Sequence, residues 1–141
     1  MIRVRVKVFE TNSSTSHTLT VYTASEYDKF QNGQLFMKKN CDQTLIPRQE
    51  AENILSDNIG KYVKELKDKD KSKLWKNCPK TYEKMIDFIY DDLDVDFCAI
   101  TNVPLSSDRY YEKNECLESD TERMVLDGKA YVFQCLYGRD C

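Results

Sequence analysis

Apolar and polar residues alternate at the start of the chain. The apolar positions are Ile2, Val4, Val6 and Val8, and the residues between them are Arg3, Arg5 and Lys7. A period of two residues is typical of a half-buried strand, here with one basic face. A second alternating segment, 18–22, is rich in β-branched and aromatic residues. Together they predict a hairpin whose connection is the polar segment 11–16.

Two later segments have apolar residues at helical spacing and predict the longer helices. The first covers about 47–67 and the second about 82–93. A shorter helix over 24–31 is predicted by the capping-box spacing of Thr23 and Glu26, which satisfies free backbone N–H groups at a helix start.

The remaining pattern completes an α+β fold. Strands are predicted over 34–39 and 95–99, and the segment 102–121 is predicted to be a long surface loop. Asp127 and Gly128 separate two strand-like runs and are typical of a two-residue hairpin turn. The predicted order is ββαβααβββ, with a mainly antiparallel sheet packed on the two longer helices.

The composition is that of a globular protein. Hydrophobic residues make up 40% and charged residues 32% of 141 residues, with only four Gly and three Pro, which argues against a disordered chain. No run approaches the roughly 18 apolar residues of a membrane helix, and the N-terminus lacks the apolar core of a signal peptide. We therefore expect a single α+β domain over 1–141, located in the cytoplasm.

The six cysteines are expected to be free thiols. The expected compartment is reducing, and the sequence has no C-x-x-C and only one histidine, so neither disulfides nor a zinc site are favoured. Cys98 and Cys135 lie within apolar segments and are expected in the core. No metal or other cofactor is predicted.

Charge is divided unevenly along the chain. Residues 1–79 carry 14 Lys or Arg and 10 Asp or Glu, whereas residues 80–141 carry 7 and 14. The second part is therefore acidic, with a net charge of −7. An acidic surface repels nucleic acid and attracts basic protein surfaces.

A polar segment between the first two predicted strands contains candidate catalytic groups. Ser13, Ser14 and His17 bring hydroxyls and an imidazole close together, which is the chemistry of a base-activated nucleophile. The alternatives are a binding loop, or a turn whose side chains bond its own backbone. A triad also needs a carboxylate to orient the imidazole, and the spacing assigns none. The enzyme hypothesis is a small hydrolase or transferase.

The same segment carries a resemblance. Residues 8–20 read V-F-E-T-N-S-S-T-S-H-T-L-T. They are similar to the start of a group of uncharacterised small proteins from phages and prophages of low-GC Gram-positive bacteria, whose N-termini read close to F-E-T-N-S-S-S-x-H-S-L. This chain differs in placing Thr15 and Ser16 before the histidine. The resemblance covers about the first quarter of the chain and implies phage origin, without implying a reaction.

Acidic residues and tyrosines in the C-terminal half are candidate partner-binding residues. They are Asp91, Asp92, Asp94, Asp96, Tyr110, Tyr111, Glu112 and Glu115. On an extended backbone, three of the four aspartates would share one face and could cage Mg²⁺ or Ca²⁺, but the glycine and distal glutamate of an EF-hand are missing. A solvated surface and an acidic protein-binding patch are the other interpretations. Tyrosines among acids suit a protein interface.

The function predicted from these features is the binding and modulation of a host protein. Phosphate-binding loops, nucleophile elbows and zinc-protease motifs do not occur in the sequence. The predicted partner is a host protein that handles nucleic acid, such as a defence nuclease inhibited in the manner of anti-CRISPR proteins. We expect no direct nucleic-acid binding and no membrane contact, with the protein in the cytoplasm of the bacterial host.

Overall fold

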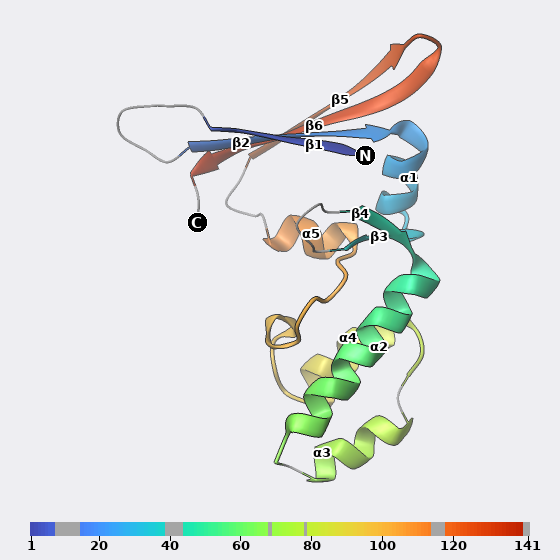
Figure 1. Ribbon diagram of the computed structural model, residues 1–141, viewed down its shortest axis with the longest axis vertical. Helices are drawn as coiled ribbons and strands as arrows, with labels where there is room; N and C mark the ends of the chain where they lie inside the picture. Colours follow the sequence, from blue (N-terminus) through green and yellow to red (C-terminus); the bar gives the residue numbers. More distant parts are fainter. Residues whose placement is uncertain (8–14, 39–43, 68, 78, 114–117, 140–141) are drawn as a thin grey trace. The chain divides into compact units, whose positions relative to one another are not determined.

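The computed structural model describes residues 1–7, 15–38, 44–67, 69–77, 79–113 and 118–139. Only the backbone is described for 2–7, 15–18, 69, 71–72, 111–113, 118 and 137–139. The chain divides into two compact units, Met1–Leu35 with Ser106–Cys141 and, between them, Phe36–Leu105. The mixed α+β class with antiparallel sheets is confirmed (Figure 1). That the whole chain forms one domain stays a prediction.

The first unit is built on a four-stranded antiparallel sheet. Its strands are β1 (Ile2–Lys7), β2 (Thr15–Thr23), β5 (Glu118–Leu126) and β6 (Lys129–Arg139). The order across the sheet is β1-β2-β6-β5, so β5 and β1 are the edges. Both predicted hairpins, β1 with β2 and β5 with β6, are confirmed.

The turn between β5 and β6 has the geometry that its sequence predicts. Asp127 and Gly128 have φ angles of 50° and 75°, and they connect the paired residues Leu126 and Lys129. Two consecutive positive φ angles define the type I′ turn, whose twist matches that of the strands. Asp and Gly are among the residues that tolerate this conformation best.

Two helices of the first unit lie on one side of this sheet (Figure 1). Helix α1 (Ala24–Gln31) begins with the predicted capping box, in which Thr23 accepts from the N–H of Glu26 at 3.2 Å. Its buried Phe30 packs on Tyr22 of β2, with ring centroids 6.4 Å apart. Helix α5 (Ser107–Lys113) adds Tyr110 against the same Phe30 at 5.9 Å.

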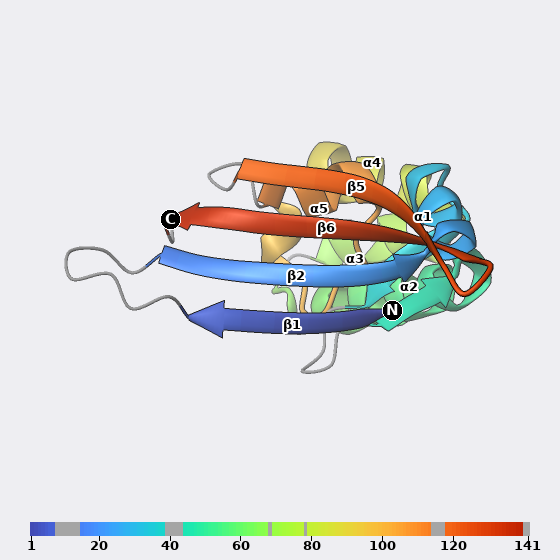
Figure 2. The same cartoon turned by 90° about the horizontal axis from the view of Figure 1, so that it is seen from above.

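Strand register separates a covered face of the sheet from an open one. Directly paired residues share a face, so each row across the strands belongs to one side. The covered rows contain the buried residues Thr20, Tyr22, Val132, Gln134 and Leu136. The alternate rows contain the half-buried residues Leu19, Val21, Phe133 and Cys135. Figure 2 looks onto this second face, which we call the open face, and no helix of the first unit lies in front of it.

The register of β1 follows the same division. Ile2 is paired with Val21, and Val4 is paired with Leu19. The apolar positions of the first strand therefore belong to rows of the open face. The covered rows combine the apolar residues Val132 and Leu136 with polar ones, and the Tyr22 hydroxyl donates to Gln134 Oε1 at 3.3 Å.

The second unit contains a two-stranded sheet and the longer helices. Its elements are β3 (Leu35–Lys38), β4 (Thr44–Pro47), α2 (Arg48–Glu65), α3 (Lys69–Leu74), the short helix η1 (Trp75–Asn77), α4 (Tyr82–Asp87), the π-helical turn η2 (Phe88–Asp92) and the short helix η3 (Phe97–Ala99). Strand β3 begins one residue before the unit itself. The predicted helices over 47–67 and 82–93 are confirmed, the latter as α4 followed by η2.

The core of the second unit lies between α2 and α4. The inner stripe of α2 is Ala51, Leu55, Ile59 and Val63, all buried. Facing them are the buried residues Met85, Ile86, Ile89 and Leu93 from α4, η2 and the residue that follows. Both sets recur at helical spacing in the sequence, which is why the pattern predicted them.

Two predicted features of the segment after η2 are wrong. The strand predicted over 95–99 is replaced by η3, because Asp94 adopts a φ of 53° and Asp96 Oδ1 accepts from Cys98 N at 3.0 Å. Short acidic side chains favour such local caps and turns over extended backbone. Cys98 is therefore exposed instead of buried, whereas Cys135 is half-buried.

The long loop predicted over 102–121 is also partly structured. It contains α5 and the start of β5, and Leu105 pairs with Met37 through two backbone hydrogen bonds of 2.8 and 2.9 Å. Polar residues dominate this segment, so neither helical nor strand periodicity is visible in it.

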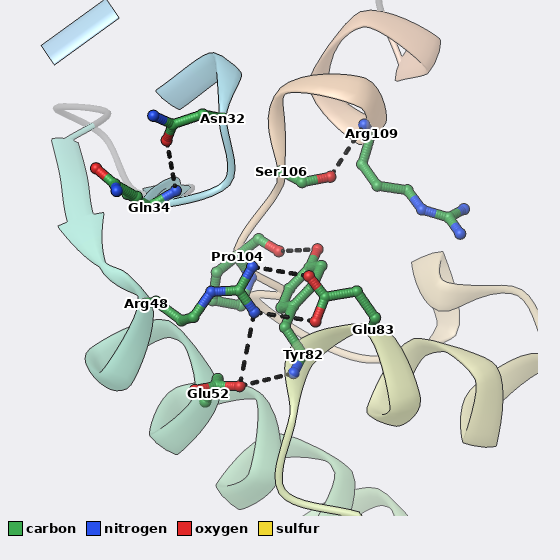
Figure 3. Close-up of polar contacts among 9 residues, drawn as sticks. All are labelled: Asn32, Gln34, Arg48, Glu52, Tyr82, Glu83, Pro104, Ser106 and Arg109. Atoms are coloured by element: carbon green, nitrogen blue, oxygen red, sulfur yellow. Dashed lines mark hydrogen bonds and ion pairs between the residues drawn. The ribbon is translucent and has the colours of Figure 1, made fainter. Parts of the chain in front are cut away.

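A polar cluster joins the starts of α2 and α4 (Figure 3). Arg48 donates two hydrogen bonds to the Glu83 carboxylate at 2.9 and 2.8 Å and also lies 5.1 Å from the centroid of the Phe36 ring. Glu52 accepts from the Tyr82 backbone N–H at 2.8 Å, which caps α4 from a neighbouring helix. The Tyr82 hydroxyl donates to Pro104 O at 2.6 Å. Side chains of α2 thus fix where α4 begins.

The core of the second unit is expected to dominate its stability. Leu55 is fully buried, so Leu55→Ala should lower the free energy of unfolding by about 2–5 kcal/mol. Asp57→Ala, at an exposed position of the same helix, should change it by less than about 0.5 kcal/mol. Urea denaturation of the full chain measures both. Equal effects of the two substitutions would contradict the assigned core.

The Arg48–Glu83 pair predicts a small pH dependence. The two hydrogen bonds from Arg48 lower the pKa of Glu83, against the opposing effect of burial. A lowered folded-state pKa adds stability above the unfolded value of about 4.3, and this is lost as the pH falls through the folded pKa. Because Glu83 is 63% exposed, Glu83→Gln should cost less than about 1 kcal/mol at neutral pH. The difference from the unsubstituted protein should shrink as the pH falls below about 4.3 and vanish once Glu83 is protonated in the folded protein. A difference that does not shrink in acid would contradict the ionic origin.

Candidate functional site

The second unit has a surface hollow with carboxylates on its wall. Its volume is about 340 Å³. The lining residues come from α3, η1, α4, η2 and the segment between η1 and α4, and they are Leu74, Asn77, Pro79, Lys84, Asp87, Phe88, Asp91 and Asp92. We call this feature the acidic hollow. It contains two of the aspartates that the sequence predicts as partner-binding, Asp91 and Asp92.

The π-helical turn explains why three aspartates reach one hollow. In an α-helix, residues four apart lie on one face, which places Asp87 and Asp91 together. In a π-helical turn the hydrogen bonds join residues five apart, as Leu93 N does with Phe88 O at 3.0 Å. This wider turn also brings Asp92 to the side of Asp87. Such turns occur frequently at functional sites.

The carboxylates of the acidic hollow are poorly compensated. Asp87, Asp91 and Asp92 are all exposed, and no ion pair or side-chain hydrogen bond joins them to another residue within the described part of the chain. They lie at the C-terminal end of α4 and η2, where the helix dipole disfavours negative charge. Lys84 is the one basic residue of the lining. The site therefore presents negative charge that the fold itself does not neutralise.

The acidic hollow also has an apolar wall. Phe88 is 5% exposed and forms part of the lining, with its ring 5.1 Å from that of Trp75. Leu74 is 50% exposed and adds apolar surface beside the ring. Exposed carboxylates beside apolar surface suit a basic protein segment whose side chains combine a long apolar stem with a charged end.

The other two predicted aspartates do not join the hollow. Asp94 occupies the left-handed region, and Asp96 caps η3. Because this backbone is not extended, Asp92, Asp94 and Asp96 do not form the common face that a cation cage would need. Over the residues with described side chains, no three His, Cys, Asp or Glu side chains are arranged to hold a metal ion.

The tyrosines and glutamates predicted for partner binding have different locations. Tyr110 is 3% exposed and packs on Phe30, so it belongs to the core of the first unit and is not available to a partner. Tyr111 and Glu112 lie in α5 with only their backbone described, and Glu115 lies outside the described residues.

The residues of the enzyme hypothesis are only partly described. Ser13 and Ser14 lie outside the described residues. The backbone of His17 lies in β2, paired with Val6 on one side and Tyr137 on the other. A catalytic role for these three residues stays a prediction.

Sequence reasoning missed part of the acidic hollow. Asp87 precedes Asp91 by four residues within a predicted helix, and that spacing was the available signal. Leu74 and Phe88 gave no such signal, because an apolar residue in or beside a predicted helix indicates packing and not a place in a binding site.

Comparison with known proteins gives no relative: no protein-family model, curated protein or solved structure matches the chain. Within its described part, none of the helices has the length and apolar character needed to span a bilayer.

Neutralising the acidic hollow should stabilise the protein. Asp87→Asn, Asp91→Asn and Asp92→Asn together remove like-charge repulsion and unfavourable dipole contacts, and we expect a gain of about 0.5–1 kcal/mol in the free energy of unfolding. Asp57→Asn, at an exposed site in the middle of α2, is the control and should have little effect. Urea denaturation at low ionic strength measures both. A loss of stability in the triple variant would mean that the three carboxylates stabilise the folded protein.

Proposed function

We propose that this protein binds a host protein and acts through the acidic hollow. The observation that carries the proposal is the convergence of three exposed, uncompensated carboxylates beside apolar surface at a π-helical turn. Negative charge at a helix C-terminus without a compensating base suits a surface that binds positive charge. The partner surface that fits is basic, with lysine or arginine side chains entering the hollow.

The proposed partner is a nucleic-acid-handling protein of the bacterial host. Such proteins carry basic surfaces that neutralise phosphates. An acidic protein can occupy a surface of this kind and exclude the nucleic acid, which is how a defence nuclease would be inhibited. The acidic balance of residues 80–141 and the phage-like N-terminal segment support this version. It implies action in the cytoplasm of the host and no direct binding to nucleic acid.

Affinity capture from host lysate tests the proposal. The unsubstituted chain should retain a partner at low ionic strength and release it as salt is raised, since exposed charge pairs are screened. The triple variant Asp87→Asn, Asp91→Asn, Asp92→Asn should retain it about tenfold less well, at about 0.5 kcal/mol for each lost pair.

The matched control removes the same charge elsewhere. Glu50→Gln, Asp57→Asn and Glu65→Gln neutralise three exposed acids of α2 and should leave capture unchanged. If both triple variants lost the partner equally, net charge and not the acidic hollow would be responsible. If the unsubstituted chain captured nothing at low salt, the binding function itself would be wrong.

A further inference from the structure

We propose that the open face of the four-stranded sheet is a second docking surface, and that its occupant is an amphipathic helix of a partner protein. The helix would lay an apolar stripe over β2 and β6 and place lysine or arginine side chains over β5. This inference concerns the first unit and does not rest on the function proposed for the acidic hollow.

The apolar part of the open face is continuous across two strands. Leu19 is paired with Cys135, and Val21 is paired with Phe133, so β2 and β6 contribute adjacent apolar rows. All four side chains are half-buried although no helix of their unit covers them. Met124 of β5 extends the surface and is 41% exposed. A contiguous apolar patch of this kind marks an interaction site.

The surface is hollowed and has acids along one edge. A hollow of about 630 Å³ is lined by Leu19, Asp120, Thr121, Glu122, Met124, Phe133 and Cys135. Asp120 is paired with Cys135, and Glu122 is paired with Phe133, so both exposed acids flank the apolar rows on β5. An occupant of the apolar rows therefore meets negative charge on its β5 side.

Strand spacing favours a helix as the occupant. Neighbouring strands lie about 4.8 Å apart, and a helix with its side chains is about 10 Å across, so one helix covers two strands. If the partner helix lies over β2 and β6, the side chains on its flank reach β5 and no further. The covered face of the same sheet already packs on a helix, α1, which in turn contacts α5.

Charge argues against a second copy of the chain. A two-fold axis across the strands would stack β5 on β5 and bring the acids of both copies together. An axis along the strands would stack β5 on β1 and place the acids over the rows of Ile2 and Val4. Neither arrangement neutralises Asp120 and Glu122, whereas a basic helix does. Anionic lipid is disfavoured for the same reason.

The probe is a fluorescently labelled helical peptide of about 20 residues, with a leucine stripe flanked on one side by lysine. Anisotropy titration of the full chain should show binding, and a peptide with the same stripe and a glutamate flank should bind at least about fivefold more weakly. The double variant Asp120→Asn, Glu122→Gln should bind the lysine peptide about fivefold more weakly than the parent does. Its affinity for the glutamate peptide should not fall. Leu19→Thr with Phe133→Thr should weaken both peptides by more than about tenfold.

Controls separate this surface from unfolding and from the acidic hollow. Threonine suits a strand, so the Leu19→Thr, Phe133→Thr variant should keep the circular dichroism spectrum of the parent. If it unfolds, the Asp120→Asn, Glu122→Gln variant alone decides the test. The triple variant of the acidic hollow should bind the lysine peptide as the parent does. The proposal would be overturned if the parent bound both peptides equally well, or if all variants bound the lysine peptide as well as the parent does. So would a parent dimer that Leu19→Thr with Phe133→Thr converts to a monomer, because the occupant would then be a second copy.

Discussion

The antiparallel pairing of β2 with β6 is the contact on which the first unit depends. It runs from Thr15 opposite Arg139 to Thr23 opposite Tyr131. It joins the N-terminal hairpin to the C-terminal hairpin. The hairpins β1–β2 and β5–β6 form locally, but only this pairing makes them one sheet. Closing so long a loop is entropically expensive, and the ladder of backbone hydrogen bonds along both strands has to offset it. The second unit occupies the sequence between these paired strands.

Local structure was predictable because its signals lie close together in the sequence. Each of three features follows from residues that are close together in the sequence. They are the capping box of α1, the type I′ turn at Asp127 and Gly128, and the apolar stripe of α2. The β2–β6 pairing has no local signal, and neither has the choice of which sheet face the helices cover. Near Asp94 the apparent alternation was too short to distinguish a strand from a capped turn.

The candidate site was predictable in composition and not in shape. Asp91 and Asp92 stood out as part of an acidic run, but their convergence with Asp87 depends on the change from α-helical to π-helical hydrogen bonding. The same run contains Asp94, which adopts a left-handed backbone conformation, and Asp96, which caps η3. Tyr110 failed as a surface residue because an amphipathic aromatic side chain suits a core as well as an interface.

The register of the sheet places polar as well as apolar side chains on the covered face, and one polar atom there is unsatisfied. Thr20, Tyr22 and Gln134 occupy covered rows, and among the described atoms Thr20 Oγ1 is buried without a hydrogen-bond partner. An unsatisfied buried hydroxyl costs about 1–3 kcal/mol. Because side chains alternate along a strand, a shift of one residue would exchange the two faces. It would bury Leu19 and Phe133 but expose Val132 and Leu136, which the present register buries. The present register therefore buries one apolar set and leaves the other half-buried on the open face. A partner on the open face, as proposed above, would complete the burial of that second set.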